Sequence, residues 1–347
     1  MQFFSAGLVL GAAFLLASAG PVIPASAADG GPVPGLAYPE GPVNPVPIPP
    51  SERGLMTVTA TPWLRVTSEN HVLEGAIFDR EGRLLFCDVT ARKVLRAGAD
   101  KKLETLVTVP DFAPGGLALH PDGRLFIAAL DFTKSLGIIC AVQPDGSGLQ
   151  TILGPERGFM PNDLVFDSKG GFYFTDFQGT ATQPDGGVYY VSPDGGSVTP
   201  VLPNLAMANG LALSPDGKTL WVTEFGRGLL HRTDLADATT IAAIGSIVPY
   251  RFTGTAPDSM RMDADGNVYV AVYGQGRIMA FNRSGLPTGQ ILLPGREKGE
   301  NLVSTSLAIR PGSRELYAVT ATEGKPAGSM IFSSAAFAAG LPPAGQR

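Results

Sequence analysis

The chain is poor in the side chains that build the commonest catalytic and metal sites, with two cysteines, three histidines and two tryptophans in 347 residues. Two cysteines are too few for a cysteine-rich zinc site, and no G-x-S-x-G nucleophile elbow occurs. The GQG at Gly274–Gly276 is too short for a dinucleotide loop and favours a turn. Charged residues make up only 16% of the chain and the net charge is −5, which argues against nucleic acid or anionic lipid as a partner.

Long apolar runs are also missing, except for residues 2–17 at the N-terminus. This run is followed by Ala25-Ser26-Ala27, an A-x-A pattern, so residues 1–27 are predicted to be a signal peptide. The protein is then exported, periplasmic or secreted, and free of the membrane; an anchor that is not removed is the alternative. Residues 28–56 are rich in proline and glycine and indicate a linker, and residues 341–347 form a C-terminal tail.

What the chain has in abundance is one phrase of 14 residues that occurs six times. Its clearest copy is GLALHPDGRLFIAA at Gly116–Ala129, and the six copies begin at residues 75, 116, 163, 210, 259 and 306. Each copy reads as an apolar strand, a turn rich in Asp, Gly and Pro, and a second apolar strand, which is a hairpin pattern. Copies spaced 41 to 49 residues apart, with several strands each, are typical of a β-propeller.

The predicted fold is therefore an all-β, six-bladed propeller over residues 57–340, with four antiparallel strands per blade. The last repeat, residues 306–332, has room for only three strands. Residues 57–66 are rich in strand formers and have no partner of their own, so we expect them to supply the missing strand and close the ring. We expect a monomer.

The first strand of each blade should line the central channel, so the residues just before these strands should meet near the axis. They are Glu74, Gly115, Asn162, Asn209, Asp258 and Thr305. Carboxylates of like sign gather when a cation compensates them, and an all-oxygen set suits Ca²⁺ or, less well, Mg²⁺. The alternative is that Asn and Asp only make turn hydrogen bonds at these positions.

The second strand of each hairpin returns to the same end of the channel. Its final residues are Asp88, Asp131, Asp176, Glu224, Tyr273 and Thr320. We expect some of them, Asp176, Glu224 and Tyr273 among them, to orient the ligands; others are then solvated rim residues.

The remaining rare residues have simpler interpretations. Cys87 and Cys140 lie in strand patterns of different repeats and are expected to be buried free thiols, with a disulfide as the alternative. His120 lies in a turn and is expected to face solvent, whereas His231 follows an outer-strand pattern and is expected to be structural. His71, three residues before Glu74, is the one histidine placed to reach the channel mouth.

Four segments resemble the family of gluconolactonases, SMP-30 and luciferin-regenerating enzymes: Glu74-Gly75, PND at Pro161–Asp163, NGLALSPDG at Asn209–Gly217 and PDS at Pro257–Ser259. Further segments, such as VFDSKGGFYFTDF at Val165–Phe177 and YGQGR at Tyr273–Arg277, are similar to calcium-dependent lactonases of that family. The likeness covers about residues 57–340 and implies a six-bladed propeller with catalytic Ca²⁺ on its axis.

By position, the resemblance implies a metal shell of Glu74, Asn162, Asn209, Asp258 and Ser259, with Asp258 also as acid and base. It implies a second, structural calcium near Ser135 and Gly137, although the matching acidic ligand falls near residues 154–156 without a clear counterpart.

The function that follows is a calcium-dependent lactonase acting on small lactone rings. The metal would polarise the lactone carbonyl and help to generate hydroxide, and Asp258 would move the proton. Two alternatives remain at this point. One is a phosphotriesterase-like hydrolase on the same fold, and the other is a propeller that only binds a small ligand.

Overall fold

The computed structural model describes residues 44–254, 256–322 and 328–342. The predicted signal peptide and most of the predicted linker lie outside the described residues. Residues 45 onward form one compact unit, built almost entirely from strands. Within the described ranges, no helix has the length and hydropathy needed to cross a bilayer.

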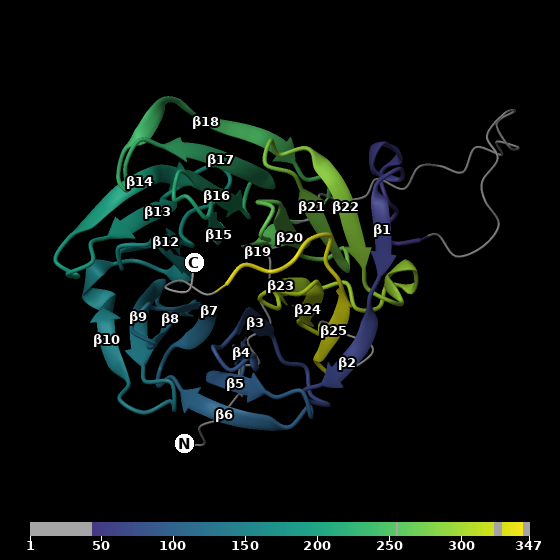
Figure 1. Ribbon diagram of the computed structural model, residues 1–347, viewed down its shortest axis with the longest axis horizontal. Coiled ribbons are helices and arrows are strands. Elements are labelled where there is room, and N and C mark those ends of the chain that lie inside the picture. Colours follow the sequence, from purple (N-terminus) through teal and green to yellow (C-terminus); the bar gives the residue numbers. More distant parts are fainter. Residues whose placement is uncertain (1–43, 255, 323–327, 343–347) are drawn as a thin grey trace, which may run out of the picture. The chain divides into compact units, whose positions relative to one another are not determined.

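Six sheets stand around a central channel, and the innermost strand of each is the first strand of its sequence repeat (Figure 1). In blades one to three, the strands are β3 Leu73–Phe78, β4 Leu84–Asp88, β5 Lys93–Ala97 and β6 Leu103–Thr108; β7 Ala113–Leu119, β8 Leu125–Asp131, β9 Leu136–Val142 and β10 Gln150–Leu153; and β11 Pro161–Phe166, β12 Phe172–Asp176, β13 Gly186–Val191 and β14 Val198–Leu205.

In blades four to six, the strands are β15 Ala208–Leu213, β16 Thr219–Glu224, β17 Leu229–Leu235 and β18 Ile241–Arg251; β19 Pro257–Met262, β20 Val268–Val272, β21 Arg277–Phe281 and β22 Pro287–Leu292; and β23 Ser304–Ile309, β24 Glu315–Thr320 and β25 Met330–Ala335. Three short 3₁₀ turns complete the described elements: η1 Pro50–Glu52, η2 Pro155–Arg157 and η3 Arg296–Lys298.

Two N-terminal strands, β1 Met56–Thr59 and β2 Thr61–Arg65, complete the ring. β2 pairs antiparallel with β25, which confirms that the N-terminal segment supplies the fourth strand of the last blade. The expected single strand over 57–66 is wrong, because β1 pairs in parallel with β22 and becomes a fifth strand of blade five. The break falls at Ala60, whose N–H donates to the carbonyl of Leu292 on blade five rather than to blade six.

The described end of the expected linker also belongs to the propeller unit. The carbonyl of Val46 accepts a hydrogen bond from Arg296, and the buried Glu52 forms an ion pair with Arg277 and a hydrogen bond with Tyr250. Residues 45–56 are therefore packed against blade five instead of forming a free linker, because two buried arginines draw this segment onto the sheet.

The apolar core is divided into six clusters that lie between neighbouring blades, as expected for sheets packed face to face. The cluster between blades one and two, for example, combines Leu85 and Val94 with Leu117 and Ile127. Cys87 and Cys140 belong to this same cluster, and both are buried free thiols, as predicted.

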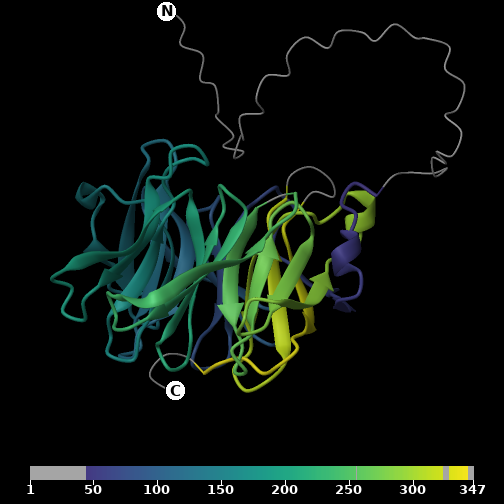
Figure 2. The same ribbon diagram turned by 90° about the horizontal axis from the view of Figure 1, so that it is seen from above.

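The channel has two different ends, visible when the ring is turned on its side (Figure 2). At the strand-start end the inner strands begin and the second strands finish. At the turn end lie the hairpin turns, and the C-terminal segment after β25 runs across it toward the axis (Figure 1). Gly340 bridges to Asp263 and to Pro311 there, which fixes this segment against blades five and six.

Candidate metal and catalytic site

The inner strands become irregular at the strand-start end of the channel. The register of the first hairpin shifts between Pro161 and Leu164, between Ala208 and Leu211, and between Pro257 and Met260. The six residues inside these bulges include Asn162, Asn209, Asp258 and Ser259, four of the five residues named as a metal shell. Bulges re-aim side chains and are common beside active sites, so the backbone itself turns these side chains out of the regular pleat.

Glycines allow the inner strands to approach one another at this end. Gly75 has φ of +58°, and a Cβ on it would lie 2.2 Å from the carbonyl oxygen of Gly115 on the next blade. A Cβ on Gly210 would lie 2.6 Å from the backbone nitrogen of Met260. A side chain at these positions would force the blades apart, and with them the polar residues that the ring brings together.

Two acids from different blades meet near the axis. Glu74 Oε2 accepts hydrogen bonds from the N–H of Gly75, at 3.1 Å, and from the hydroxyl of Ser259, at 3.2 Å. Burial and the nearby carboxylate of Asp258 raise the pKa of Glu74 well above its ordinary value. Burial also raises the pKa of Asp258, against the opposing effect of hydrogen bonds from Asn209 and from the Ser259 backbone.

The oxygen atoms around these acids fit a hard cation. Asn209 is 3% exposed, and within the described residues its Oδ1 is buried without a hydrogen-bond donor. A buried acceptor without a donor is costly, and so is the repulsion between two neighbouring carboxylates. A cation held between this oxygen and the two carboxylates would remove both costs. The described side chains include no group of three or more His, Cys, Asp or Glu placed to hold a metal. The set here has two acids and is completed by amide and hydroxyl oxygens, a mixture that suits Ca²⁺.

The six axial positions are not equivalent. The hydroxyl of Thr305 donates to the carbonyls of Leu73, at 2.6 Å, and Val319, at 3.1 Å, so it ties blade six to blade one. Gly115 has no side chain. The candidate ligands therefore come from blades one, three, four and five.

Two acids at the ends of second strands hold the backbone just before a candidate ligand. Asp176 Oδ1 accepts from the N–H of Met160, at 2.8 Å, and Glu224 Oε1 accepts from the N–H of Ala206, at 2.8 Å. Burial raises the pKa of Asp176 to about 6. Burial opposes ionisation of Glu224, but hydrogen bonds from His231 and Ala206 outweigh it and lower the pKa of that carboxyl.

The other strand-end residues do different work. Asp88 contacts His71 Nδ1 at 2.8 Å, so His71 pairs with this acid instead of entering the axial cluster. Hydrogen bonds from Thr133 and Lys134 lower the pKa of Asp131 to about 2 at the rim. Thr320 donates to the carbonyl of Met330, and the ring of Tyr273 packs edge-on against Phe225.

The three histidines all pack within the domain. His231 is buried and contacts Glu224 Oε2 at 2.8 Å. The expectation that His120 faces solvent is wrong: its side chain is 19% exposed, because its ring packs against Phe126 and Phe166.

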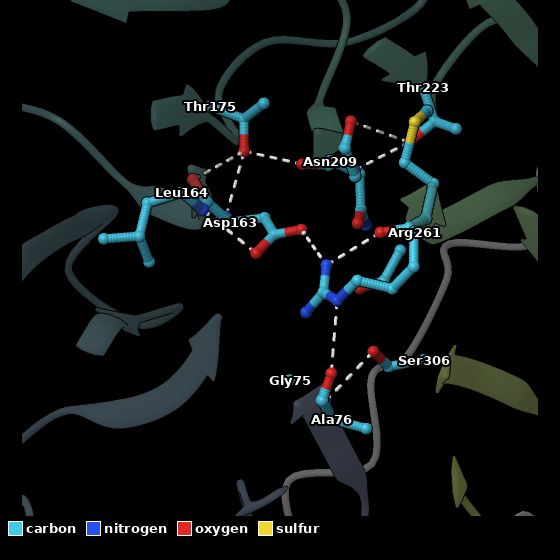
Figure 3. Close-up of polar contacts among 12 residues, drawn as sticks. Gly75, Ala76, Asp163, Leu164, Thr175, Asn209, Thr223, Arg261 and Ser306 are labelled. Carbon is cyan, nitrogen blue, oxygen red and sulfur yellow. Dashed lines mark hydrogen bonds and ion pairs between the residues drawn. The ribbon is translucent and has the colours of Figure 1, made fainter. Parts of the chain in front are cut away.

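Sequence reasoning missed two hydroxyls that position the ligand-bearing strands. Thr175 donates to the backbone carbonyl of Asn209, at 2.6 Å, and Thr223 donates to that of Asp258, at 2.8 Å (Figure 3). Each joins one blade to the inner strand of the next. A signal existed, since a threonine precedes the final acid of the second strand in two repeats, FTD and VTE.

Asp163 was also missed, although it begins a repeat where the other five copies have glycine or serine. It is 1% exposed and contacts Arg261 Nη1 at 2.9 Å (Figure 3). Burial raises the pKa of Asp163, while Arg261 acts in the opposite direction.

The residues implied for a second calcium are less well placed. Ser135 is exposed and has φ of +53°. Gly137 lies in β9, where a Cβ would be 2.5 Å from the carbonyl oxygen of Ala129, so close packing already requires glycine there. The second calcium stays a prediction.

Comparison with known proteins agrees with this architecture. The profile of the SMP-30/Gluconolactonase/LRE-like region matches residues 72–322. Lactonase drp35 of Staphylococcus saprophyticus is 48% identical over 318 residues, covering 90% of this chain and 98% of the relative. Lactonase drp35 of Staphylococcus aureus strain USA300 is 45% identical over 294 residues, covering 84% and 91%.

Solved structures share the fold at lower identity. A calcium-binding protein, regucalcin, from Agrobacterium tumefaciens superposes with a TM-score of 0.67 at 19% identity, covering 83% of this chain and 98% of that one. A gluconolactonase from Xanthomonas campestris gives a TM-score of 0.63 at 19% identity, covering 86% and 99%.

Proposed function

The chain belongs to the SMP-30/gluconolactonase/LRE-like family, and from this premise we propose that it is a calcium-dependent lactonase. The observation that carries the proposal is the arrangement of Glu74, Asn209 and Asp258. Two desolvated carboxyls, and one amide oxygen that has no donor among the described residues, come from three blades to one place. The similarity to proteins named lactonase supplies the substrate class.

Glu74, Asn162, Asn209, Asp258 and Ser259 would hold the ion. Bound there, Ca²⁺ would act as a Lewis acid toward a lactone carbonyl and make a bound water more acidic. An all-oxygen set with two carboxylates favours Ca²⁺ over Mg²⁺, which demands a smaller and more regular shell.

Asp258 is the residue best placed to move a proton. Its carboxylate is held by hydrogen bonds from Asn209 and from the Ser259 backbone, and Thr223 fixes its own carbonyl. An oriented carboxylate can accept a proton from the attacking water and return it to the alkoxide that leaves when the ring opens. Ser259 in turn orients Glu74 through the 3.2 Å hydrogen bond.

We further propose that the protein is exported and acts as a monomer on small lactones. The apolar run at residues 2–17 and the A-x-A pattern at 25–27 support export. The closed ring supports a monomer, because the ends of the propeller are joined by β2 and do not present two open sheet edges.

The test is hydrolysis of a panel of aromatic, sugar and aliphatic lactones and of phosphotriesters, with Ca²⁺ or with EGTA. We expect lactone hydrolysis that EGTA abolishes and Ca²⁺ restores. The melting temperature should rise by several degrees with Ca²⁺, because an ion at 100 times its Kd stabilises the native state by about 2.7 kcal/mol. Hydrolysis of no lactone in the panel, or full activity in EGTA, would contradict the proposal.

A further inference from the structure

Arg261 crosses the central channel next to the candidate metal site. It lies on β19, three residues after Asp258. Its Nε donates to the carbonyl of Ala76 on β3, at 3.2 Å, and its Nη1 contacts Asp163 Oδ2 on β11, at 2.9 Å. One side chain thus links the inner strands of blades five, one and three, as Figure 3 shows.

The partner of Arg261 is a third acid in the channel. Asp163 directly follows the candidate ligand Asn162 in the bulge of β11 and is 1% exposed. Arg261, which contacts it, reaches the carbonyl of Ala76, two residues after Glu74, so the charge of Asp163 lies beside the candidate metal shell. Without Arg261, the carboxylates of Glu74, Asp258 and Asp163 would together present a charge of −3 to a metal near the axis.

The surroundings leave this ion pair weakly screened. On the turn side of Arg261 lies a cavity of about 150 Å³ that is lined mainly by apolar side chains, with Leu341 and Pro342 among them. Charges in apolar surroundings interact more strongly than charges in water. Stability alone does not explain the pair, because a buried ion pair often stabilises a fold no more than apolar residues of similar size would. Arg261 Nη2 is also buried without a partner within the described residues.

We propose that Arg261 is a fixed counter-charge of the metal site, which neutralises the negative charge of Asp163. It thereby sets the affinity of the site for cations and the ionic charge that the site prefers. This inference rests on the proposed metal site. With Arg261 present, Glu74 and Asp258 give the site a charge of −2, which matches a divalent ion. Loss of Arg261 should strengthen cation binding and favour trivalent ions, and loss of Asp163 should weaken it.

The test is a double-mutant cycle on the purified full chain: Arg261→Met, Asp163→Asn and the double variant. Isothermal titration gives the Kd for Ca²⁺, and sensitised luminescence gives the Kd for Tb³⁺. We expect Arg261→Met to lower the Ca²⁺ Kd about tenfold, with a larger change for Tb³⁺, because the energy scales with the charge of the ion. Asp163→Asn should raise the Ca²⁺ Kd about tenfold, and the double variant should return to within about threefold of wild type.

Folding defects do not remove the test. Arg261→Lys keeps the charge but loses the planar fork, so it should bind Ca²⁺ within about threefold of wild type even if its melting temperature falls. If Arg261→Met does not fold without metal, the Kd of Asp163→Asn is compared with that of the double variant. A Kd that falls back toward the wild-type value in the double variant still supports the proposal. The matched control is Arg310→Met, since Arg310 directly follows an inner strand and also joins a carboxylate, Glu315, and a backbone carbonyl, that of Gly82. It should leave both Kd values unchanged.

The cycle separates the two proposals. Wild-type protein that binds neither ion overturns the metal site and this inference with it. Wild-type protein that binds Ca²⁺, while the two single variants shift the Kd in the same direction or not at all, overturns the role of Arg261 alone.

Discussion

The two ends of the channel use the same residue types for different purposes. At the turn end, Asp263 follows β19 and has both carboxylate oxygens engaged: Oδ1 accepts from the N–H groups of Asp265 and Asn267, and Oδ2 accepts from Asn267 and Tyr269. At the strand-start end, Glu74 accepts its two hydrogen bonds from described residues on a single oxygen, Oε2. An acid with every lone-pair direction occupied is structural, whereas an acid with one oxygen left over can accept a ligand.

The comparison repeats around the ring. Asp79 and Asp167 occupy the same place in their repeats as Asp263, and Oδ1 of each accepts two backbone N–H groups of its turn. Three of the six turns are therefore built around the same aspartate, whereas the other three repeats have His120, Ser214 and Arg310 at this position. At the strand-start end, the equivalent axial positions carry different residue types: Glu, Asn, Asn and Asp on four blades, and Gly and Thr on the other two.

The sharpest way to test this difference is to make the same change at both ends of β19. Asp258→Asn keeps the shape and one ligand oxygen but removes the proton carrier, so we expect lactone hydrolysis at saturating Ca²⁺ to fall ~10²–10⁴-fold. Asp263→Asn should keep wild-type activity and serves as the control. Initial rates with circular-dichroism melts distinguish the cases, and a fully active Asp258→Asn variant would remove Asp258 from the proton transfer.

The converse test concerns stability. Asp263→Ala leaves two backbone N–H groups and the Tyr269 hydroxyl without their acceptor, and Asp263 is fully buried. Loss of such an acceptor costs about 1–3 kcal/mol. We expect the free energy of unfolding in urea to fall by this amount while KM and the Ca²⁺ Kd stay unchanged. A selective loss of Ca²⁺ affinity would show that the two ends are not independent.

The two ends of the channel also differ in how far they can be predicted from the sequence. The turn end and the register of the blades could be predicted, because Asp, Gly and Pro recur at fixed places in each repeat and act locally. The four candidate ligand positions followed from this register. The pairing of Asp163 with Arg261 could not be predicted, since the two residues are 98 positions apart and meet only when the ring closes. The division of residues 57–66 between two blades was equally hidden, because their strand-forming pattern shows no interruption at Ala60.

The smallest expected effect lies within the strand-start end, where Asp131 and Asp176 are the last residues of the second strands of successive blades, β8 and β12. Burial raises the pKa of Asp176 to about 6, whereas Thr133 and Lys134 lower that of Asp131 to about 2. Because the pKa of Asp176 is higher in the folded state than in the unfolded state, its protonated form favours folding. This contribution is complete below about pH 4, the ordinary pKa, and is lost as the pH rises through 6. A lowered pKa means that Asp131 favours folding above about pH 4 and loses this contribution as the pH falls through 2.

The two amide variants should therefore differ in sign at pH 8. Asp176→Asn removes a buried charge and keeps an oxygen for the N–H of Met160, so we expect the free energy of unfolding to rise by about 1 kcal/mol, less than the full equivalent of a two-unit pKa shift. Near pH 4 the variant should match wild type. Asp131→Asn should lower the free energy of unfolding only slightly at pH 8, since its partners are exposed. Urea melts at the two pH values measure both changes, and destabilisation by Asp176→Asn at pH 8 would mean that the buried carboxylate interacts with a cation at this end of the channel.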